Sequence, residues 1–595
     1  MQQIKRLVNK ALPAGSRRRE IAKRVYSRIK MVTPPSSAVT TYQDWIDEFE
    51  QQGLVPEKAY AYQPLISIIV PAFNTPDKYL LPLLDSICAQ TYTRWELVLI
   101  EASPDPERAV AIHEQAQRDK RIRLIKVGEN KGIAENTNLG LAEARGDYVA
   151  FLDHDDTLAP FALNEVVAVL QDHPEVDLFY SDEDKLSDDG TERSLPFFKP
   201  DWSLDLFLGV NYLAHFVVVR KLIADKVQGI RIGFNGAQDF DFLLRVLDEK
   251  PVIHHIPHIS YHWRMADGST ARAIDAKNYA DDAGRRALAD YVKRNKIAAD
   301  VLEIPNKPTN YRLKYHTPGN PKASLIIPFK DKVELTKVMV DSILTKTTYP
   351  NYEIILVDNR SEELATQEYL ASLKDELRIK TVLYDKPFNW SAVNNFGRRQ
   401  ATGEVLVFLN NDMEVVKPEW LEELVGVALQ PRVGAVGSLL RYPDKMIQHA
   451  GVVLGFFGVA GHVFRGLLPD DFTYFGIAAW PRNYLAVTGA CIAVTAKKFD
   501  AVGRFDENFY TAGSDVVFGI ACHQAGYDNV YWPFSELLHY ENVSVGKYGE
   551  RNDNQHDYDE SMKYYRPYLE RGDPFFNPNL EVHGPQAEQI KLRRS

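Results

Sequence analysis

The feature of this 595-residue sequence that most constrains its fold is an internal repeat. The segment PLISIIVPAFN (64–74) is similar to KASLIIPFKD (322–331), and Ser67 corresponds to Ser324 at a spacing of 257 residues. Polar and glycine positions keep this spacing without a gap up to residue 155; the pairs include Glu96 and Glu353, Asn138 and Asn395, Gly140 and Gly397, and Gly146 and Gly403. A repeat of this length predicts two versions of one domain, called here the first and the second copy.

Each copy is expected to alternate strands and helices. In the first copy, apolar runs predict strands at 65–70, 96–100, 122–126 and 148–152, and helical spacing predicts helices at 79–90, 106–118 and 132–144. This alternation indicates an α/β fold with a parallel, Rossmann-like sheet that helices cover on both faces. Ligands of such sheets bind beyond the carboxyl ends of the strands, so polar residues at those ends are candidates for function.

One strand end carries a cluster of carboxylates. The stretch YVAFLDHDDTLAP (148–160) places Asp153, Asp155 and Asp156 directly after an apolar run. Like charges this close repel each other unless a cation lies among them, and Mg²⁺ and Mn²⁺ prefer oxygen ligands. The cluster therefore predicts a divalent cation site, and the alternative is a solvated acidic turn that caps the next helix.

Composition excludes several classes of protein. The net charge of −11 argues against nucleic acid as a partner, because nucleic-acid-binding domains are usually basic. The three cysteines, Cys88, Cys491 and Cys522, form no CxxC pair, which argues against structural zinc and against a disulfide framework. No apolar run reaches the roughly 18 residues of a membrane span. We therefore expect a cytoplasmic protein.

The N-terminal region, residues 1–63, differs from the rest in charge. Within residues 1–32 the basic residues far outnumber the single acid, Glu20, and two groups of apolar residues have helical spacing. Basic amphipathic helices bind anionic membrane surfaces, which predicts a peripheral anchor on the inner face of the plasma membrane. A solvated helical arm, or an arm docked on the body of the protein, is the alternative.

These motifs together resemble a tandem family 2 glycosyltransferase with two GT-A domains, over nearly all of residues 64–550. The matching segments are SIIVPAFN, NKGIAENTNLGLAEARGDYVAFLDHDD and AQDFDFLLR in the first copy, and SLIIPFKD, PFNWSAVNNFGRRQATGEVLVFLNNDMEV and GSDVVFGIACHQAGY in the second. The similarity is greatest to bacterial enzymes of O-antigen and cell-wall polysaccharide synthesis, many of them rhamnosyltransferases. It predicts GT-A domains at 64–300 and 320–580.

The resemblance implies roles for the acidic motifs. Asp155 is expected to bind the metal, while Asp153 faces the ribose or a metal-bound water. In the second copy the motif reads Asn410-Asn411-Asp412, where Asp412 alone is expected to bind the metal, more weakly, with Asn410 at the nucleotide.

The family also places an acid after its second strand to accept a hydrogen bond from the N3–H of uracil or thymine. Asp358 in LVDN matches this position, and Glu101 in LIEAS is a longer substitute. For both residues the alternative is an ordinary surface acid that follows a strand.

The catalytic bases are expected at the starts of two helices. The family uses an acid there to take the proton of the acceptor hydroxyl, and Asp239 in AQDFDFLLR and Asp515 in GSDVVFG match it, although Gln238 and Ser514 replace the acid that normally precedes it. A helix N-terminus favours the ionised carboxylate, which suits a base. The same placement also suits a helix cap without a catalytic role.

Late histidines are expected to complete the metal sites. His262 and His539 lie 277 residues apart, close to the 276 residues between the two predicted bases. Imidazole is an acceptable ligand for Mn²⁺ or Mg²⁺, although a lone histidine is more often structural. Arg264, two residues further on, could instead contact the diphosphate.

Three further residues are candidates for sugar binding. Asp182 and Glu183 in YSDEDK could bind sugar hydroxyls, and a plain loop is the equal alternative. Trp480 in WPRNYLAVTGACIAV could stack on a sugar, although core packing is the better interpretation of that residue.

The function implied by the resemblance is inverting, metal-dependent transfer of sugars from dTDP- or UDP-sugars, with L-rhamnose as one candidate sugar, to a lipid-linked bacterial surface polysaccharide. One alternative is that only one copy is catalytic and the other grips the glycan. Two others are a sugar-nucleotide nucleotidyltransferase, against which VPAFNTPDK lacks a glycine-rich phosphate loop, and a non-enzymatic glycan-binding scaffold.

Overall fold

The computed structural model describes residues 41–52, 60–104, 112, 114, 116–117, 119–266, 274–540, 555–582 and 590. The chain divides into two compact units, residues 54–589 and a smaller unit of residues 1–53 with 590–595. The predicted basic helices within residues 1–32 lie outside the described residues. In the smaller unit, helix α3 (Tyr42–Gln52) begins with a capping interaction in which the Asp44 amide donates to Thr41 Oγ1 (3.1 Å) and the Thr41 amide donates to Asp44 Oδ2 (2.8 Å).

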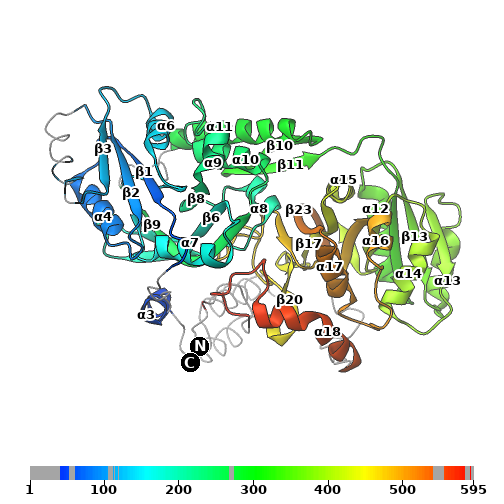
Figure 1. Cartoon of the computed structure of the whole chain (residues 1–595). Coiled ribbons are helices and arrows are strands. Elements are labelled where there is room, and N and C mark those ends of the chain that lie inside the picture. Colours follow the sequence, from blue (N-terminus) through cyan, green and yellow to red (C-terminus); the bar gives the residue numbers. More distant parts are fainter. Residues whose placement is uncertain are drawn as a thin grey trace, which may run out of the picture. The chain divides into compact units, whose positions relative to one another are not determined.

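The described part of the first copy is built on a nine-stranded mixed sheet with the order β3-β2-β1-β4-β8-β6-β9-β5, where β7 pairs with β6 (Figure 1). Its strands are β1 (Ile66–Ala72), β2 (Trp95–Glu101), β3 (Ile122–Lys126), β4 (Tyr148–Phe151), β5 (Thr157–Leu158), β6 (Leu178–Leu186), β7 (Arg193–Phe197), β8 (Val217–Arg220) and β9 (Ile253–Arg264). Its helices are α4 (Asp77–Cys88), α6 (Ile133–Glu143), α7 (Ala162–Asp172), α8 (Leu204–Gly209), α9 (Lys221–Lys226), α10 (Gln238–Asp248) and α11 (Ile274–Arg294). Most of the helix predicted at 106–118 lies outside the described residues.

Both faces of this sheet are buried. Ile68 and Val70 of β1 pack with residues of α4 and α7, whereas Ile69 packs on the opposite face with residues of α6 and α10. Successive side chains of a strand point to opposite faces, so a strand that helices cover on both sides must be apolar throughout. This explains why β1 and β2 read as unbroken apolar runs in the sequence.

The second copy repeats this plan around a sheet that has ten strands among the described residues. The strand order is β14-β13-β12-β15-β22-β17-β23-β16, and in addition β18 pairs with β17 and β21 pairs with β23. Its strands are β12 (Ala323–Phe329), β13 (Tyr352–Asp358), β14 (Ile379–Leu383), β15 (Val405–Leu409), β16 (Met413–Val415), β17 (Val433–Arg441), β18 (Ile447–His449), β21 (Arg482–Tyr484), β22 (Cys491–Thr495) and β23 (Asp528–His539). Its helices are α12 (Val333–Lys346), α13 (Leu364–Ser372), α14 (Trp390–Gln400), α15 (Trp420–Ala428), α16 (Ala496–Ala501), α17 (Ser514–Gln524) and α18 (Gln555–Arg571).

Two small hairpins complete the described elements. Strands β10 (Ala299–Ile304) and β11 (Lys307–Tyr315) pair with each other between the two copies in sequence, and β19 (Val452–Leu454) pairs with β20 (Ala460–His462), with the 3₁₀ turn Phe456–Gly458 between them. The predicted α/β architecture with two similar sheet-containing copies in tandem is confirmed.

The repeated serine and glycine positions have one structural reason. Ser67 Oγ donates to Glu96 Oε1 (2.7 Å) and accepts from the Gly146 amide (2.8 Å), and the second copy repeats this network, with 2.6 and 2.8 Å, at the residues 257 further on. A Cβ on Gly146 would lie 2.7 Å from the Ser67 amide nitrogen, so no larger residue fits. Buried polar groups of this kind must be paired, which fixes both partners in each copy.

The two copies contact each other through buried polar groups within residues 54–589. Ser203 Oγ donates to Asn483 Oδ1 (2.9 Å), and the Arg432 guanidinium donates to both carboxylate oxygens of Asp205 (2.8 and 2.6 Å). Ser203, Asn483 and the Asp205 side chain are almost fully buried, so these bonds lie in the interior.

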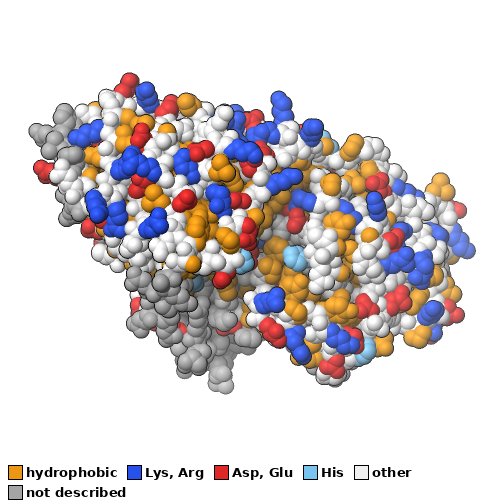
Figure 2. All heavy atoms as spheres, in the orientation of Figure 1, with side chains coloured by type: hydrophobic (Ala, Val, Ile, Leu, Met, Phe, Trp, Pro, Cys, Tyr) orange, Lys and Arg blue, Asp and Glu red, His pale blue; other side chains and the backbone are white. Residues whose placement is uncertain are grey.

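The surface carries charges of both signs. On the face in Figure 2, Lys and Arg side chains are interspersed with Asp and Glu. None of the described helices combines the length and apolar character that crossing a bilayer requires.

Candidate functional site

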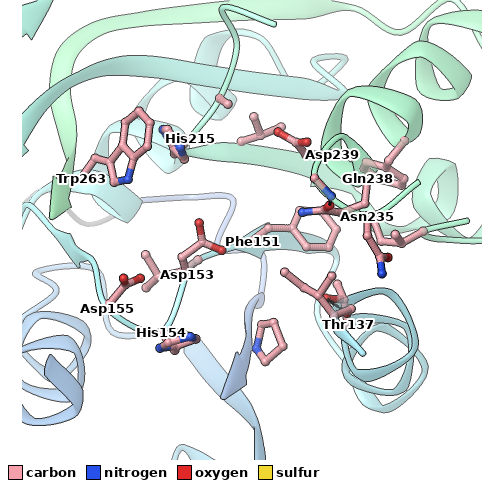
Figure 3. A pocket seen from close by; sticks show the side chains of 18 of the residues that line it. Thr137, Phe151, Asp153, His154, Asp155, His215, Asn235, Gln238, Asp239 and Trp263 are labelled. Atoms are coloured by element: carbon pink, nitrogen blue, oxygen red, sulfur yellow. Dashed lines mark hydrogen bonds between the residues drawn. The ribbon is translucent and has the colours of Figure 1, made fainter. Parts of the chain in front are cut away.

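A cavity of about 1040 Å³ lies in the first copy beyond the carboxyl ends of β1 and β4. Figure 3 shows Asp153, Asp155, His215, Asp239 and Trp263 around it. These side chains come from the turn after β4, the segment before β8, the start of α10 and the end of β9, so distant parts of the sequence meet here.

Two of the three clustered acids face this cavity. The Asp153 side chain is accessible to solvent from the cavity, although protein surrounds the cavity wall on which it lies. This enclosure and the neighbouring carboxylate of Asp155 raise the pKa of Asp153, whereas the charge of His215 lowers it. Asp156 points away and accepts hydrogen bonds from the Tyr261 hydroxyl and from the Arg264 amide (2.6 Å). The first pair suits a cation, because a bound cation relieves the repulsion that raises the pKa.

Arg264 supports the acidic turn and does not line the cavity. Its Nε donates to the Asp155 carbonyl oxygen (2.7 Å), and its Nη1 donates to the carbonyl oxygens of Ser187 and Asp188 (3.3 and 3.2 Å). With 2% of its surface exposed, it is turned into the protein. The expected contact with a diphosphate is therefore replaced by a positioning contact with the backbone that carries Asp155.

The structure does not bring His262 to the cavity. Its Nδ1 contacts Asp184 Oδ1 (2.7 Å) on the other side of β9, and its neighbours Tyr261 and Trp263 line the cavity instead. In the first copy Thr157 pairs with His262, so the preceding residue, Asp156, lies opposite Trp263. Met413, the counterpart of Asp156 in the second copy, lies opposite His539. The register differs by one residue between the copies, which puts the two histidines on opposite faces of their strands.

Asp239 lies at the start of α10, along the cavity. It is half-buried, and its Oδ2 accepts from Asn211 Nδ2 (2.8 Å). Enclosure by protein raises the pKa of Asp239, and this effect exceeds that of the backbone amides of the helix start. The amides of the helix start do favour the ionised carboxylate, as the sequence predicts, but enclosure outweighs them, and a raised pKa also suits a base that works near neutral pH.

Glu183 is turned towards three cationic side chains and not towards a sugar site. Its Oε2 lies 3.3 Å from Lys199 Nζ and 3.1 Å from His215 Nδ1, and its Oε1 lies 3.5 Å from Lys185 Nζ. Burial would raise the pKa of Glu183, but these cations hold it well below its usual range. The sequence motifs do not identify His215. Val217 and Ile492 pair with equivalent residues of β4 and β15, so Ala490 occupies the position of His215 in the second copy. This difference between the two copies is a sequence signal that could have drawn attention to His215.

Asp182 and Trp480 lie at the contact between the copies. Asp182 is fully buried and binds the Lys199 amide (2.8 Å), His255 (2.9 Å) and Asn577 Nδ2 (2.7 Å). Trp480 donates through Nε1 to Asn310, and 8% of its surface is exposed. Neither residue lines the cavity. Trp480 packs in the interior, which is the interpretation that the sequence favoured, and Asp182 is enclosed by protein on all sides.

The acids expected at the nucleotide base lie at the ends of β2 and β13. Glu101 is buried; its Oε1 accepts from the Ser103 amide (2.6 Å), while its Oε2 has no hydrogen-bond partner within the described residues. Asp358 Oδ1 accepts from the Ser361 amide (2.8 Å). A buried carboxylate oxygen without a donor suits a ligand N–H group.

The second copy has a different arrangement at the corresponding strand end. Asp412 Oδ1 and His539 Nε2 are buried 3.2 Å apart but form no hydrogen bond, and Asp412 Oδ1 and His539 Nδ1 have no partner among the described residues. A carboxylate and an imidazole placed in this way suit a divalent cation between them. The backbone N–H of Asn410 donates to the Ala490 carbonyl oxygen (3.0 Å). Within the described part of the chain, no three side chains are grouped in a way that could hold a metal ion.

Asp515 is the counterpart of Asp239. Its Oδ2 accepts from the Gly489 amide (2.6 Å) and its Oδ1 from the Val516 amide (2.9 Å), while enclosure by protein raises its pKa. A Cβ on Gly489 would lie 2.7 Å from the Trp390 ring, which shows how closely that ring packs here. Each copy thus places a carboxyl of raised pKa at a helix start and at least one carboxylate at a strand end.

Comparisons with known proteins agree with this arrangement. The model of the family "Glycosyl transferase family 2" matches residues 67–227 and 324–494, once in each copy. The chain is 41% identical over 545 residues to the O-antigen biosynthesis protein RfbC of Myxococcus xanthus, covering 89% of this chain and 42% of that protein. It is 38% identical over 587 residues to the uncharacterized protein y4gI of Sinorhizobium fredii, covering 95% of this chain and 64% of that one.

Solved structures are similar at lower identity. Staphylococcus aureus TarS 1–349 in complex with UDP-GlcNAc is 18% identical with a TM-score of 0.32, covering 39% of this chain and 72% of that one. GalNAc-T7 with UDP, GalNAc and Mn²⁺ is 17% identical with a TM-score of 0.35, covering 44% and 52%. The chain spans 42% of the length of the Myxococcus xanthus protein and 64% of that of the Sinorhizobium fredii protein, less than two thirds of each.

Proposed function

The chain belongs to glycosyl transferase family 2, and we propose that it transfers sugars from nucleotide-sugar donors to a growing bacterial surface polysaccharide. The observation that carries this proposal is the cavity of the first copy, where Asp153 and Asp155 lie on one side and Asp239 on the other (Figure 3). The similarity to the O-antigen biosynthesis protein of Myxococcus xanthus supports the polysaccharide as product.

The proposed reaction uses these three carboxylates. Asp239 accepts the proton of the acceptor hydroxyl, whose oxygen forms a bond to the anomeric carbon while the bond from that carbon to the diphosphate oxygen breaks. A single base and a single displacement invert the configuration of that carbon. Asp153 and Asp155 would hold a Mg²⁺ or Mn²⁺ ion, which neutralises negative charge on a leaving diphosphate when it is bound.

The second copy has its own version of each part. Asp515 would act as its base, Asp412 and His539 would hold the cation, and Asp358 would accept from the N3–H of a uracil or thymine base. Glu101 would do the same in the first copy through its unpartnered oxygen. We accordingly propose dTDP- or UDP-sugars, with L-rhamnose as one candidate, as donors.

We further propose a lipid-linked acceptor. The basic residues within 1–32 would hold the enzyme at the anionic inner face of the plasma membrane, where such acceptors are found. An alternative assigns catalysis to one copy and glycan binding to the other, and it is favoured by the replacement of His215 and Trp263 of the first copy by Ala490 and His539 in the second.

The test is transfer from a panel of nucleotide sugars, with Mn²⁺ and with EDTA, by the wild type, Asp239→Asn and Asp515→Asn. If both copies work, each substitution abolishes one linkage and leaves the other. Asp225→Asn, in an exposed carboxylate on α9, serves as a matched control that should change nothing. Unchanged transfer by both base variants would refute the assignment of the bases, and loss of all transfer by only one of them would favour the alternative.

A further inference from the structure

His215 lines the first cavity, and the sequence motifs of neither copy explain it. It lies on the segment before β8 and faces the cavity between Trp263 and Asp239, across from Asp153 (Figure 3). The charge of His215 acts on the ionisation of both Asp153 and Asp239, which places it between the two groups that the reaction requires.

The imidazole of His215 is held in one orientation. Its ring stacks on Tyr261 at 5.3 Å between centroids and packs against Trp263 at 4.1 Å. Its Nδ1 lies 3.1 Å from Glu183 Oε2, and that carboxylate is itself fixed by the fully buried Lys199. A ring that packs against two aromatic side chains and is held at Nδ1 presents its other nitrogen in one direction.

The tautomer follows from this partner. Because Glu183 is ionised beside its cationic neighbours, it can only accept, so Nδ1 of His215 carries the proton. Burial alone would lower the pKa of His215, but the Glu183 carboxylate raises it above its usual value. Nε2 has no hydrogen-bond partner among the described residues. In the protonated ring Nε2 is therefore a donor without an acceptor, on a residue that lines the cavity.

We propose that His215 contacts the donor in the first site, where its Nε2 donates a hydrogen bond to an oxygen of the bound nucleotide sugar. This rests on the proposed function. The oxygen belongs either to the diphosphate or to a sugar hydroxyl, because both can accept a hydrogen bond. The bond that joins the sugar to the diphosphate must lie in the cavity between Asp153 and Asp239, so both groups are within this region. The second copy, with Ala490 at this position, has no such contact, so the two sites bind their donors differently.

The experiment is calorimetric titration of the full chain with UDP, dTDP, UDP-glucose and dTDP-L-rhamnose, in the presence of Mn²⁺ and again in EDTA. An Asp412→Ala background silences the second site. His215→Asn keeps a donor towards Glu183 but loses the one at Nε2, whereas His215→Gln can still reach the position of Nε2. His173→Gln, at an exposed histidine, is the matched control.

We expect His215→Asn to weaken binding by about 10- to 100-fold, the usual effect of a hydrogen bond to a charged group. His215→Gln should retain more of the affinity than His215→Asn, and the control should retain all of it. Weaker binding of UDP and dTDP themselves assigns the contact to the diphosphate, and weaker binding of only the nucleotide sugars assigns it to a sugar hydroxyl.

Equal affinities of His215→Asn, His215→Gln and the wild type would overturn the proposal while leaving the proposed function intact. If the wild type binds none of the four compounds, the proposed function itself fails. A thermal unfolding temperature equal to that of the wild type shows that a variant is folded, and should His215→Asn fail this check, His215→Gln and His215→Ala decide the question by the same comparison.

Discussion

Replacing Arg432 with methionine is expected to destabilise the body formed by residues 54–589 by about 3–5 kcal/mol. Arg432 donates two hydrogen bonds to Asp205 across the contact between the copies, at 2.8 and 2.6 Å. The Asp205 side chain is 1% exposed, so without the guanidinium its charge stays buried and only Asn483 Nδ2 (2.8 Å) still binds it. The cost is that of an uncompensated buried carboxylate.

The double variant Arg432→Met/Asp205→Leu separates this cause from loss of packing. Removing both charges leaves no unpaired ion at position 205. The remaining cost of about 1–3 kcal/mol comes from Asn483 Nδ2, which keeps only its 3.4 Å contact with the Asn529 carbonyl oxygen, and from the partly exposed Asp528, which loses its 2.9 Å contact with Arg432. Asp225→Ala removes an exposed pair with Lys221 on one helix and should cost only about 0.3–0.5 kcal/mol.

The assay is thermal unfolding followed by circular dichroism. Unfolding entropy is about 2.1 cal/mol/K per residue, so it is about 1.1 kcal/mol/K for the body of residues 54–589, and the single variant should unfold roughly 3–4 °C below the wild type. The double variant should recover part of this loss. A single variant that unfolds within about 2 °C of the wild type, or a double variant no more stable than the single one, would refute the reasoning.

Three further outcomes are expected. Since Asp239 must be deprotonated to accept a proton and its pKa is raised, kcat/KM for the first linkage, measured in an Asp515→Asn background, should fall with decreasing pH at a pH above the ordinary 3.8; an acid limb at or below 3.8 would contradict this. His539→Ala should weaken Mn²⁺ binding in the second copy by at least the roughly 10–100-fold that loss of an outer-shell partner costs, whereas His262→Gln, measured by the same calorimetry, should leave Mn²⁺ binding unchanged and lower the unfolding temperature because it breaks the contact with Asp184. Glu101→Met should weaken UDP binding about 10-fold or more, because the unpartnered carboxylate oxygen is lost; equal affinity would remove Glu101 from the nucleotide site.

The parts of the structure that follow from local sequence were predictable. Strands β1 and β12 begin and end 257 residues apart, as do β2 and β13, and β3 and β14. The reason is that each buried strand and each tight glycine contact constrains the residues next to it, so the spacing in the sequence survives in the fold.

The errors arose where a residue's surroundings come from distant segments. His262 does not reach the predicted metal site, because β9 pairs with β5 in a register that differs by one residue from the pairing of β23 with β16. The spacing of the two histidines in the sequence does not reveal this difference. Asp182 is buried by Asn577, nearly 400 residues away, and Glu183 is bound by the side chains of Lys199 and His215. Burial of this kind depends on tertiary packing, which no local pattern encodes.

The most direct test of the central claim, that each copy holds a nucleotide-sugar site, is the stoichiometry of nucleoside diphosphate binding. Equilibrium dialysis of the full chain against UDP or dTDP with Mn²⁺ should give two bound molecules per chain, one of which is lost in Asp412→Ala and the other in Asp155→Ala. A stoichiometry of one or none at saturation would contradict the claim.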